Sequence, residues 1–446
     1  MKKPIVIIGA GLCGTLLAIR LAQRGYTVQL HEKRADMRLV EMSAGRSINL
    51  ALSMRGLCGL RLIGLEAEVQ AECIAMPGRM VHPLGADVRF FKYSGREGEF
   101  INSVSRGGLN IQLLNEAEKH PNISLHFESS CTFVDLSNAV ATFRNEADGS
   151  VTTVEGDVIF GTDGAGSALR NSMMARTPEL LFNYSQDFLR HGYKELHIPP
   201  ATDGGYRIEK NALHIWPRGS YMIIALPNMD GSFTVTMFMP FTGENSFEQL
   251  DTPEKVAAFF SEKFPDLVAD TPDFVADYFK NPIGTLGTIK CYPWQAYGKT
   301  CLLGDAAHAI VPFYGQGMNA SFEDVVVLDS IIDQHEGDWE ATLTAFQDQR
   351  KRDTDAIADL AVDNFYEMRD HTANPVFNKK RLLETQLEQT FADYFSKYSL
   401  VTFRPDVPYS FAMHRGRQQD ALLMDICANM ELVNPDEVIE AVRRLP

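Results

Sequence analysis

Residues 4–14 read PIVIIGAGLCG, a short apolar run followed at once by three glycines in the order G-x-G-x-x-G. Apolar residues at helical spacing continue through Leu21, and Gly25 stands where such a helix would end. A second apolar strand is expected over residues 27–31, and it terminates in Glu32. A strand, a glycine turn, a helix and a second strand with an acid about twenty residues beyond the glycines predict a unit that binds a dinucleotide.

Each residue of the glycine turn has an expected task. Gly9 and Gly11 allow a tight turn and a close approach of the backbone to a pyrophosphate, whereas Gly14 lets the helix pack on the strand. Leu12 and Cys13 open the helix, whose free N–H groups and positive dipole end favour phosphate. The alternative is a plain turn between a strand and a helix.

The end of the second strand is predicted to hold the adenosine side of the cofactor. Glu32 would accept hydrogen bonds from the ribose hydroxyls. Lys33 and Arg34 follow it and are expected at the same part of the cofactor. A solvated surface position is the alternative for Arg34.

Two further glycine segments lie far along the chain. Residues 161–164 read GTDG, and Asp163 is expected beside the middle of the cofactor, with a helix cap as the alternative. Residues 302–308 read LLGDAAH, where Asp305 can hold a ribityl hydroxyl and His308 is interpreted as a packed structural histidine. A nicotinamide dehydrogenase needs only the first segment, whereas a hydroxylase built around tightly held FAD needs all three.

A helix is expected to begin near Gly317, after the segment PFYGQGMN at residues 312–319. Its positive end would face the pyrimidine edge of a flavin, where negative charge appears on reduction. The backbone N–H groups of Met318 and Asn319 would lie at that edge.

Composition excludes several classes of partner. The net charge of −16 disfavours nucleic acid and anionic lipid surfaces. Seven cysteines, an odd number without a C-x-x-C pair, indicate reduced thiols in the cytoplasm and no metal site. A strand that starts at Pro4 leaves no room for a signal peptide, and no apolar run has the length of a membrane segment.

The predicted fold class is α/β, with a Rossmann-like FAD-binding domain interrupted by an antiparallel-sheet substrate domain and followed by a C-terminal helical region. Short β-rich runs at residues 213–216, 221–226 and 233–239 indicate the sheet. Residues 101–130 are interpreted as a helix between strands. The predicted divisions are 1–75, 97–180 and 285–372 for the FAD-binding domain, 76–96 and 181–284 for the sheet domain, and 373–446 for the helical region.

The chain resembles the kynurenine 3-monooxygenase family of FAD-dependent aromatic hydroxylases from about residue 5 to about residue 410. The blocks that carry the resemblance are GRSINLALS (45–53), GRMVH (78–82), HGYKEL (191–196), LHIWP (213–217), PFYGQGMN (312–319), NFYEM (364–368) and YSLVTF (398–403). The resemblance implies L-kynurenine as substrate, NADPH as reductant, and O₂ as oxidant. It implies 3-hydroxy-L-kynurenine as product, through a flavin hydroperoxide, and no catalytic side chain. It also implies a form without the membrane segment of eukaryotic members.

The resemblance also implies roles for individual residues. Arg79 matches the arginine that binds the substrate carboxylate, and Tyr93 and Tyr398 match its supporting phenols. Asn364 resembles the polar contact to the amino-acid end of the substrate. The remaining matches are Phe238, Phe313 and Met368 in the aromatic pocket, Arg106 on the flavin, and Ala51 beside the cofactor. Gly107 and Gly108 depart from the expected charged residues, which leaves the start of the local helix open.

The residues themselves leave alternatives open. Asn364 is the only polar member of an apolar helical face, and its partner could be backbone instead of a ligand. Phe238 stands on the opposite strand face from Phe233, which suits either a cleft or cross-strand packing. Arg79 could form an exposed salt bridge. A hydroxylase for another aromatic acid and a non-catalytic FAD-binding protein are the alternative functions, and the oligomeric state is not predicted.

Overall fold

Strand β1 (Ile5–Ile8) is buried at every residue and lies inside a six-stranded sheet of order β18-β19-β12-β1-β2-β8. It pairs in parallel with β2 (Val28–His31) on one side and with β12 (Ile159–Gly161) on the other. Strand β12 pairs in parallel with β19 (Thr300–Leu302). Each of these four strands is followed by one of the predicted cofactor segments, so the carboxyl ends of neighbouring strands bring those segments to one edge.

Helix α1 (Leu12–Gln23) connects β1 to β2 and ends before Gly25, as the sequence predicts. Its buried side chains join the core around the parallel sheet, because the chain places apolar residues on the face that meets the strands. The structure is a computed structural model, and it describes residues 3–40, 49–271, 273–371, 374–430 and 433–446. Residues 45–48 of the block GRSINLALS lie outside the described residues.

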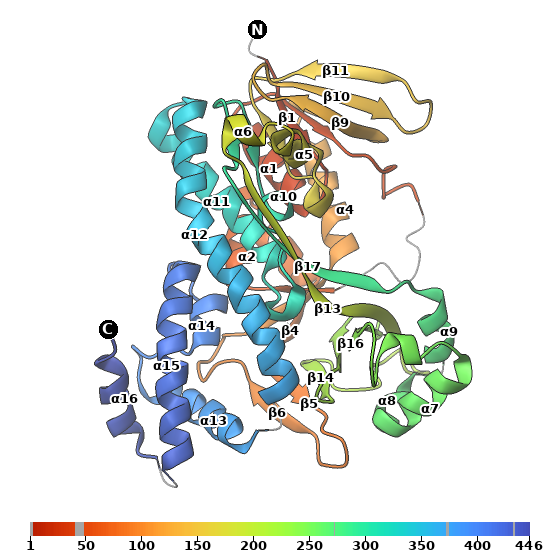
Figure 1. Ribbon diagram of the computed structural model, residues 1–446, viewed down its shortest axis with the longest axis vertical. Helices are drawn as coiled ribbons and strands as arrows, with labels where there is room; N and C mark the ends of the chain where they lie inside the picture. Colours follow the sequence, from red (N-terminus) through yellow and green to blue (C-terminus); the bar gives the residue numbers. More distant parts are fainter. Residues whose placement is uncertain (1–2, 41–48, 272, 372–373, 431–432) are drawn as a thin grey trace.

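A seven-stranded sheet of order β17-β13-β16-β15-β14-β5-β6 lies below the parallel sheet in Figure 1. All neighbouring strands of this sheet pair antiparallel except β5 (Gly78–Val81) and β14 (Leu213–Pro217), which pair in parallel. The sequence predicted an antiparallel sheet and missed this pair, since β5 reaches the sheet from a distant part of the chain. Strand β17 (Gly284–Tyr292) pairs with β13 (Asn183–Ile198) at the other edge of the sheet.

The two faces of this sheet pack against different layers. Phe233 and its alternate neighbours in β16 (Phe233–Pro240) share a core with α7 (Pro253–Lys263), α8 (Pro265–Asp270) and α9 (Phe274–Lys280). Phe238 belongs to a separate core with α12 (Trp339–Tyr366). The strand alternation in the sequence predicted this division, and the structure confirms it.

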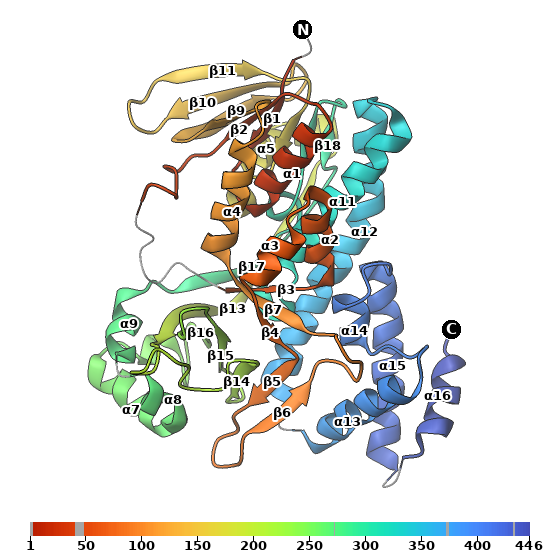
Figure 2. The same ribbon diagram turned by 180° about the vertical axis from the view of Figure 1, so that it is seen from behind.

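The C-terminal helices form a further layer beside α12, seen at the lower left of Figure 1 and from behind in Figure 2. They extend to Arg443, within the stretch 373–446 for which the sequence predicts a helical region. Their own core contains Leu387, Tyr394 and Leu423. The four helices are α13 (Pro375–Thr390), α14 (Lys397–Thr402), α15 (Tyr409–Asn429) and α16 (Pro435–Arg443).

The prediction of a helix over residues 101–130 was wrong in its extent. The segment begins with strand β7 (Ile101–Ser105), continues as helix α4 (Arg106–Glu118) and returns as strand β8 (Ile123–His126). The remaining strands are β3 (Asn49–Leu52), β4 (Ile74–Met76), β6 (Arg89–Lys92), β9 (Ser129–Asp135), β10 (Val140–Asn145), β11 (Val151–Glu155), β13 (Asn183–Ile198), β15 (Met222–Pro227) and β18 (Gln295–Ala296). The remaining helices are α2 (Met54–Ile63), α3 (Glu66–Ala71), α5 (Ala168–Met174), α6 (Thr177–Leu180), α10 (Asp305–His308) and α11 (Gly317–His335), with 3₁₀ turns at Gly164–Gly166, Phe247–Gln249 and Pro312–Tyr314 and a π-helical turn at Glu367–His371.

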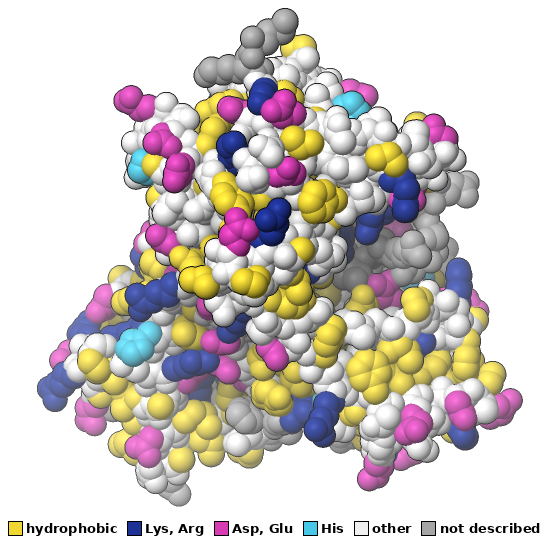
Figure 3. Space-filling model, turned by 45° about the horizontal axis from the view of Figure 1, so that its top comes forward, with side chains coloured by type: hydrophobic (Ala, Val, Ile, Leu, Met, Phe, Trp, Pro, Cys, Tyr) yellow, Lys and Arg dark blue, Asp and Glu magenta, His cyan; other side chains and the backbone are white. Residues whose placement is uncertain are grey.

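Acidic and basic side chains are interspersed on the face shown in Figure 3, without a continuous basic area. In the parts of the chain that the structure describes, none of the helices has an apolar stretch of the length that crossing a bilayer demands.

Replacing Phe233 by alanine should lower the free energy of unfolding by about 3–5 kcal/mol, because a fully buried ring would leave a cavity. Thermal and urea unfolding would measure the change. Phe188→Ala is the matched control, since Phe188 is 57% exposed and its loss should change stability by about 0.5 kcal/mol or less. Equal losses in the two variants would contradict the assignment of Phe233 to the core.

Candidate functional site

The three glycine segments touch one another. Gly9 has a φ of +100°, and a Cβ at this position would lie 2.7 Å from the carbonyl oxygen of Thr162 in the second segment. Gly304 of the third segment has a φ of +59°, and a Cβ there would lie 3.2 Å from Sγ of Cys13. Only glycine fits such positions without strain. Segments that are about 150 residues apart in the chain therefore form one continuous backbone surface.

Gly11 and Gly14 differ in what surrounds them. A Cβ at Gly14 would lie 2.0 Å from the carbonyl oxygen of Gly9, so this glycine is required for packing the helix on the strand. Apart from its chain neighbours, a Cβ at Gly11 would meet no atom of the described residues within 4 Å. The open space at Gly11, next to the first N–H groups of α1, fits a pyrophosphate that approaches the backbone.

Glu32 is buried at the carboxyl end of β2. Its carboxylate accepts hydrogen bonds from the backbone N–H of Ala10 at 3.0 Å and from Nε of Arg34 at 2.7 Å. These contacts fix the carboxylate beside the glycine turn. The side chain of Arg34 is mostly exposed, and Lys33 is exposed as well.

Asp163 performs the capping task that the sequence left open, but with only one oxygen. Its Oδ2 accepts a hydrogen bond from the backbone N–H of Ala168 at 2.6 Å, at the start of α5. Its Oδ1 is buried and has no hydrogen-bond partner among the described residues, and burial raises the pKa of this carboxyl. A buried unsatisfied oxygen is costly, so Oδ1 fits a hydroxyl donor of a bound cofactor.

The first turn of α11 presents backbone N–H groups, as the sequence predicts for residues after Gly317. The helical hydrogen bonds begin with Ala320, whose N–H donates to the carbonyl oxygen of Gln316. The preceding N–H groups, including those of Met318 and Asn319, therefore have no acceptor within the helix. Asp305 is exposed at the adjacent turn, where a ribityl hydroxyl could reach it.

The side chain of Asn319 is occupied by the protein. Its Oδ1 accepts a hydrogen bond from the backbone N–H of Ser53, and its Nδ2 donates to the carbonyl oxygens of Ala51 and Gly315. Asn319 thus joins the Ala51 strand to the first turn of α11, a task that nothing in the sequence indicated. Only its backbone is left for a cofactor.

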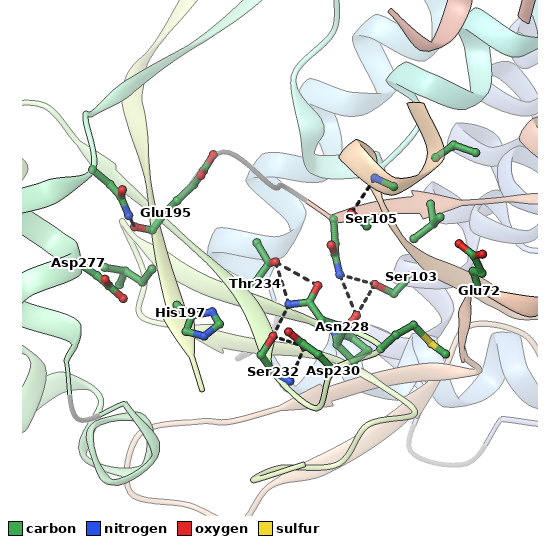
Figure 4. Close-up of a pocket in the computed structure, with 18 of the residues that line it drawn as sticks. Glu72, Ser103, Ser105, Glu195, His197, Asn228, Asp230, Ser232, Thr234 and Asp277 are labelled. Carbon is green, nitrogen blue, oxygen red and sulfur yellow. Dashed lines mark hydrogen bonds between the residues drawn. The ribbon is translucent and has the colours of Figure 1, made fainter. Parts of the chain in front are cut away.

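Arg106 is the exposed first residue of α4. The Ser105 side chain accepts a hydrogen bond from the N–H of Gly108 and caps the helix, which explains how the two glycines after Arg106 are accommodated. A cavity of about 570 Å³ lies beside this helix start (Figure 4). Glu72, Ser103 and Asp230 are among its lining residues, none of which the sequence singled out.

Arg79 lies on β5 and is only 9% exposed. Among the described residues it makes no ion pair and no hydrogen bond through its guanidinium group; its contact is with the ring of Tyr93, 5.8 Å away. Burial lowers its pKa, and the nearby positive charge of Arg381 lowers it further. A buried guanidinium group without an anion favours an anionic ligand. The predicted alternative of an exposed salt bridge is wrong.

Tyr93 and Tyr398 stack beside Arg79, with ring centroids 4.9 Å apart and planes inclined by 11°. Burial raises the pKa of both phenols, that of Tyr398 to about 12. Both hydroxyls therefore stay protonated near neutral pH and can donate hydrogen bonds. Two other charged residues act on the pKa of Arg79: the positive charge of Arg381 lowers it, and the negative charge of Glu367 raises it. The sequence missed both, although Glu367 stands inside the block NFYEM.

The aromatic residues predicted around the substrate ring share one core with Met368. Phe313 contacts Phe238, with ring centroids 4.8 Å apart, and also Phe365 at 4.5 Å. Asn364 donates a hydrogen bond from Nδ2 to the carbonyl oxygen of Phe313 at 2.6 Å. The backbone alternative for Asn364 is thus present, and no described residue donates a hydrogen bond to its Oδ1.

Two glycine variants should separate packing from cofactor binding. Gly14→Ala should destabilise the cofactor-free protein by about 1–3 kcal/mol, because the backbone must move to admit the methyl group. Gly11→Ala should leave that stability unchanged and raise the Kd for FAD by about tenfold or more, since its methyl group would meet only the cofactor. Thermal unfolding of the cofactor-free protein and fluorescence titration with FAD measure the two effects. Loss of stability in Gly11→Ala would contradict the open space at Gly11.

The chain matches a known domain family, and it also aligns with known proteins over nearly its whole length. The family described as FAD binding domain matches residues 2–361. A kynurenine 3-monooxygenase of Myxococcus xanthus is 47% identical over 426 residues, which cover 95% of this chain and 91% of that protein. A kynurenine 3-monooxygenase of Dictyostelium discoideum is 42% identical, over 98% of this chain and 96% of that protein.

The solved structures agree on the fold. The tetrameric form of 2-methyl-3-hydroxypyridine-5-carboxylic acid oxygenase superposes with a TM-score of 0.68 at 21% identity, covering 89% of this chain and 99% of that chain. At this identity the likeness supports the fold alone, an architecture with a mixed α/β part, a second sheet and a C-terminal helical part. The relatives that match nearly the whole length show more: the protein belongs to the kynurenine 3-monooxygenase family.

Proposed function

We propose that this protein hydroxylates L-kynurenine to 3-hydroxy-L-kynurenine, with FAD as cofactor, NADPH as reductant and O₂ as oxidant. The names of its relatives and the FAD-binding family match support this proposal. One observation carries the substrate class. Arg79 is a buried cation without an anionic partner among the described residues, and it lies at the end of an aromatic cluster. An aromatic amino acid supplies both a carboxylate and a ring.

In this proposal Arg79 forks two N–H groups onto the substrate carboxylate. The neutral hydroxyls of Tyr93 and Tyr398 donate to the same carboxylate. Oδ1 of Asn364 accepts a hydrogen bond from the substrate ammonium group, because its Nδ2 already donates to Phe313. These contacts fix the amino-acid end of the substrate and so orient its ring.

Phe238, Phe313 and Met368 would pack on the substrate ring and exclude water from it. The residues that we assign to FAD are the glycine turn at 9–14, Glu32 with Lys33 and Arg34, Ala51, Arg106, Asp163, Asp305, and Gly317, Met318 and Asn319 in the first turn of α11. Bound FAD supplies the activated oxygen, and the protein contributes orientation and electrostatic stabilisation. The substrate's own amino group activates the ring, so no protein base is assigned.

Two further parts of the proposal concern organisation and location. We assign residues 1–75, 97–180 and 285–372 to the FAD-binding domain, 76–96 and 181–284 to the substrate domain, and 373–446 to the helical region. We also assign the protein to the cytoplasm, which the seven unpaired cysteines support.

Incubating the purified protein with kynurenine, NADPH and O₂ tests the function. Mass spectrometry should detect 3-hydroxykynurenine, and NADPH oxidation should be stimulated by kynurenine but not by 4-hydroxybenzoate or salicylate. Stimulation by one of those acids instead would assign another aromatic substrate. A yellow protein without substrate-stimulated NADPH oxidation would reject an enzymatic function.

Arg79→Gln should raise the KM for kynurenine about 10- to 100-fold, since a hydrogen bond to a charged group contributes about 1.5–3 kcal/mol. The Kd for FAD should not change. Arg89→Gln is the control, because Arg89 is an exposed arginine on the neighbouring strand β6 and should leave KM unaltered. An unchanged KM in Arg79→Gln would remove Arg79 from the substrate site.

A further inference from the structure

The N-terminal end of α11 is held by a residue from the C-terminal helices. Gln316 caps this helix and is 2% exposed, and its carbonyl oxygen accepts the first helical hydrogen bond. Its side-chain Oε1 accepts a hydrogen bond from the hydroxyl of Tyr409 at 3.0 Å. The hydroxyl of Ser53 is the other neighbour of Oε1, at a longer 3.5 Å. The Tyr409 hydroxyl is thus the main restraint on the Gln316 side chain.

Tyr409 itself is fixed on its other side. It is the first residue of α15 and is fully buried, and the guanidinium carbon of Arg55 lies 3.8 Å from its ring centroid. Burial raises the pKa of this phenol, so its hydroxyl remains a donor near neutral pH. The side chain of Tyr409 is therefore held at two points, by Arg55 at its ring and by Gln316 at its hydroxyl.

Arg55 ties this tyrosine to the segment before it. Arg55 is 1% exposed, and its guanidinium group donates to the carbonyl oxygens of Leu400, Val401, Arg404 and Val407 at 2.6–3.4 Å. It also forms an ion pair with Glu323 of α11. Each of the three guanidinium nitrogens of this buried charge has an acceptor, and movement of the side chain would break these hydrogen bonds.

The same network of hydrogen bonds and ion pairs reaches Gly304, in the turn where Asp305 is proposed to hold the ribityl chain of FAD. Glu323 also pairs with Arg350 of α12 at 2.8 Å, and Arg350 donates to Oδ1 of Asp324 at 2.8 Å. Oδ2 of Asp324 accepts a hydrogen bond from the backbone N–H of Gly304 at 3.0 Å and lies 2.6 Å from Nε2 of His308. Buried hydrogen bonds therefore connect both turns proposed to face the flavin, at Gly304 and Gln316, with the C-terminal segment.

We propose that Tyr409 is a positioning residue for the cofactor: its hydroxyl sets the first turn of α11, and through it the affinity and the reduction potential of bound FAD. Tyr409 does not itself contact the cofactor. The proposal rests on the proposed function in taking FAD as the molecule that faces this turn. It assigns to the C-terminal helices a task at the flavin that is separate from substrate binding by Tyr398.

Tyr409→Phe is the sharpest test, because it keeps the ring under Arg55 and deletes only the hydroxyl. The Kd for FAD, measured by titrating the cofactor-free protein, should rise about 3- to 10-fold, the effect of one lost neutral hydrogen bond. The reduction potential of the bound flavin should become more negative, because misplaced N–H groups stabilise the charge of the reduced form less well. The KM for kynurenine should stay within about twofold of the wild-type value.

Tyr394→Phe is the matched control. Tyr394 is buried in the same C-terminal layer, and its hydroxyl has no hydrogen-bond partner among the described residues. Its loss should change neither the Kd for FAD nor the flavin potential. Gln316→Met removes the acceptor, and the double variant with Tyr409→Phe should be no worse than the more affected single variant, since both delete one bond.

Three outcomes would overturn the proposal. They are an unchanged Kd and potential in Tyr409→Phe, effects equal to those of Tyr394→Phe, and additive effects of the Tyr409 and Gln316 changes. A lower melting temperature with unchanged flavin properties would make Tyr409 merely structural, which also rejects the proposal. Failure of the proposed function is distinguishable, because it would appear in the wild-type protein as absent FAD binding or absent 3-hydroxykynurenine.

Discussion

Parallel hydrogen bonding between β2, β1, β12 and β19 is the constraint on which the cofactor site depends. Strands that run in one direction end at one edge, so three turns far apart in sequence meet there without any direct sequence relation. The positive φ at Gly9 and Gly304 lets these turns approach to contact distance. A change of register or direction in one of these strands would displace its turn. The site therefore depends on backbone pairing before any side chain contributes.

The second sheet and the helices hold the residues of the proposed substrate site. Strand β5 brings Arg79, α12 brings Asn364, and α14 brings Tyr398, so the residues proposed for the amino-acid end come from three distant elements. The aromatic cluster around Phe313 continues directly from the segment that leads into α11. The proposed cofactor and substrate regions are thus joined by a stretch of a few residues. A displacement of the backbone in one region would therefore displace the other.

The sequence predicted the parts that depend on local patterns. The glycine spacing predicted the βαβ unit, and the alternation in residues 233–239 predicted which side of the sheet Phe238 faces. It could not predict contacts between residues that are far apart in the sequence and come together only in the folded chain. The parallel pairing of β5 with β14, the role of the Asn319 side chain, and the approach of Arg381 to Arg79 join residues with no shared motif. Asn364 shows why. A polar residue on an apolar helical face can bind either a backbone acceptor or a ligand, and the sequence does not distinguish the two. In the structure its Nδ2 donates to the carbonyl oxygen of Phe313, and its Oδ1 could still accept a hydrogen bond from a ligand.

Arg79 is buried, and the positive charge of Arg381 lies close enough to oppose that of Arg79. Arg381 itself is only partly buried and pairs with Glu384. When no anion is bound, Arg79 thus carries an electrostatic strain in the proposed substrate region. A carboxylate would relieve that strain while bridging β5 and the C-terminal helices. Binding free energy and folding free energy are then linked, and the ligand acts as a removable part of the core. The C-terminal layer should accordingly be the portion of the molecule whose local opening responds most to the concentration of substrate.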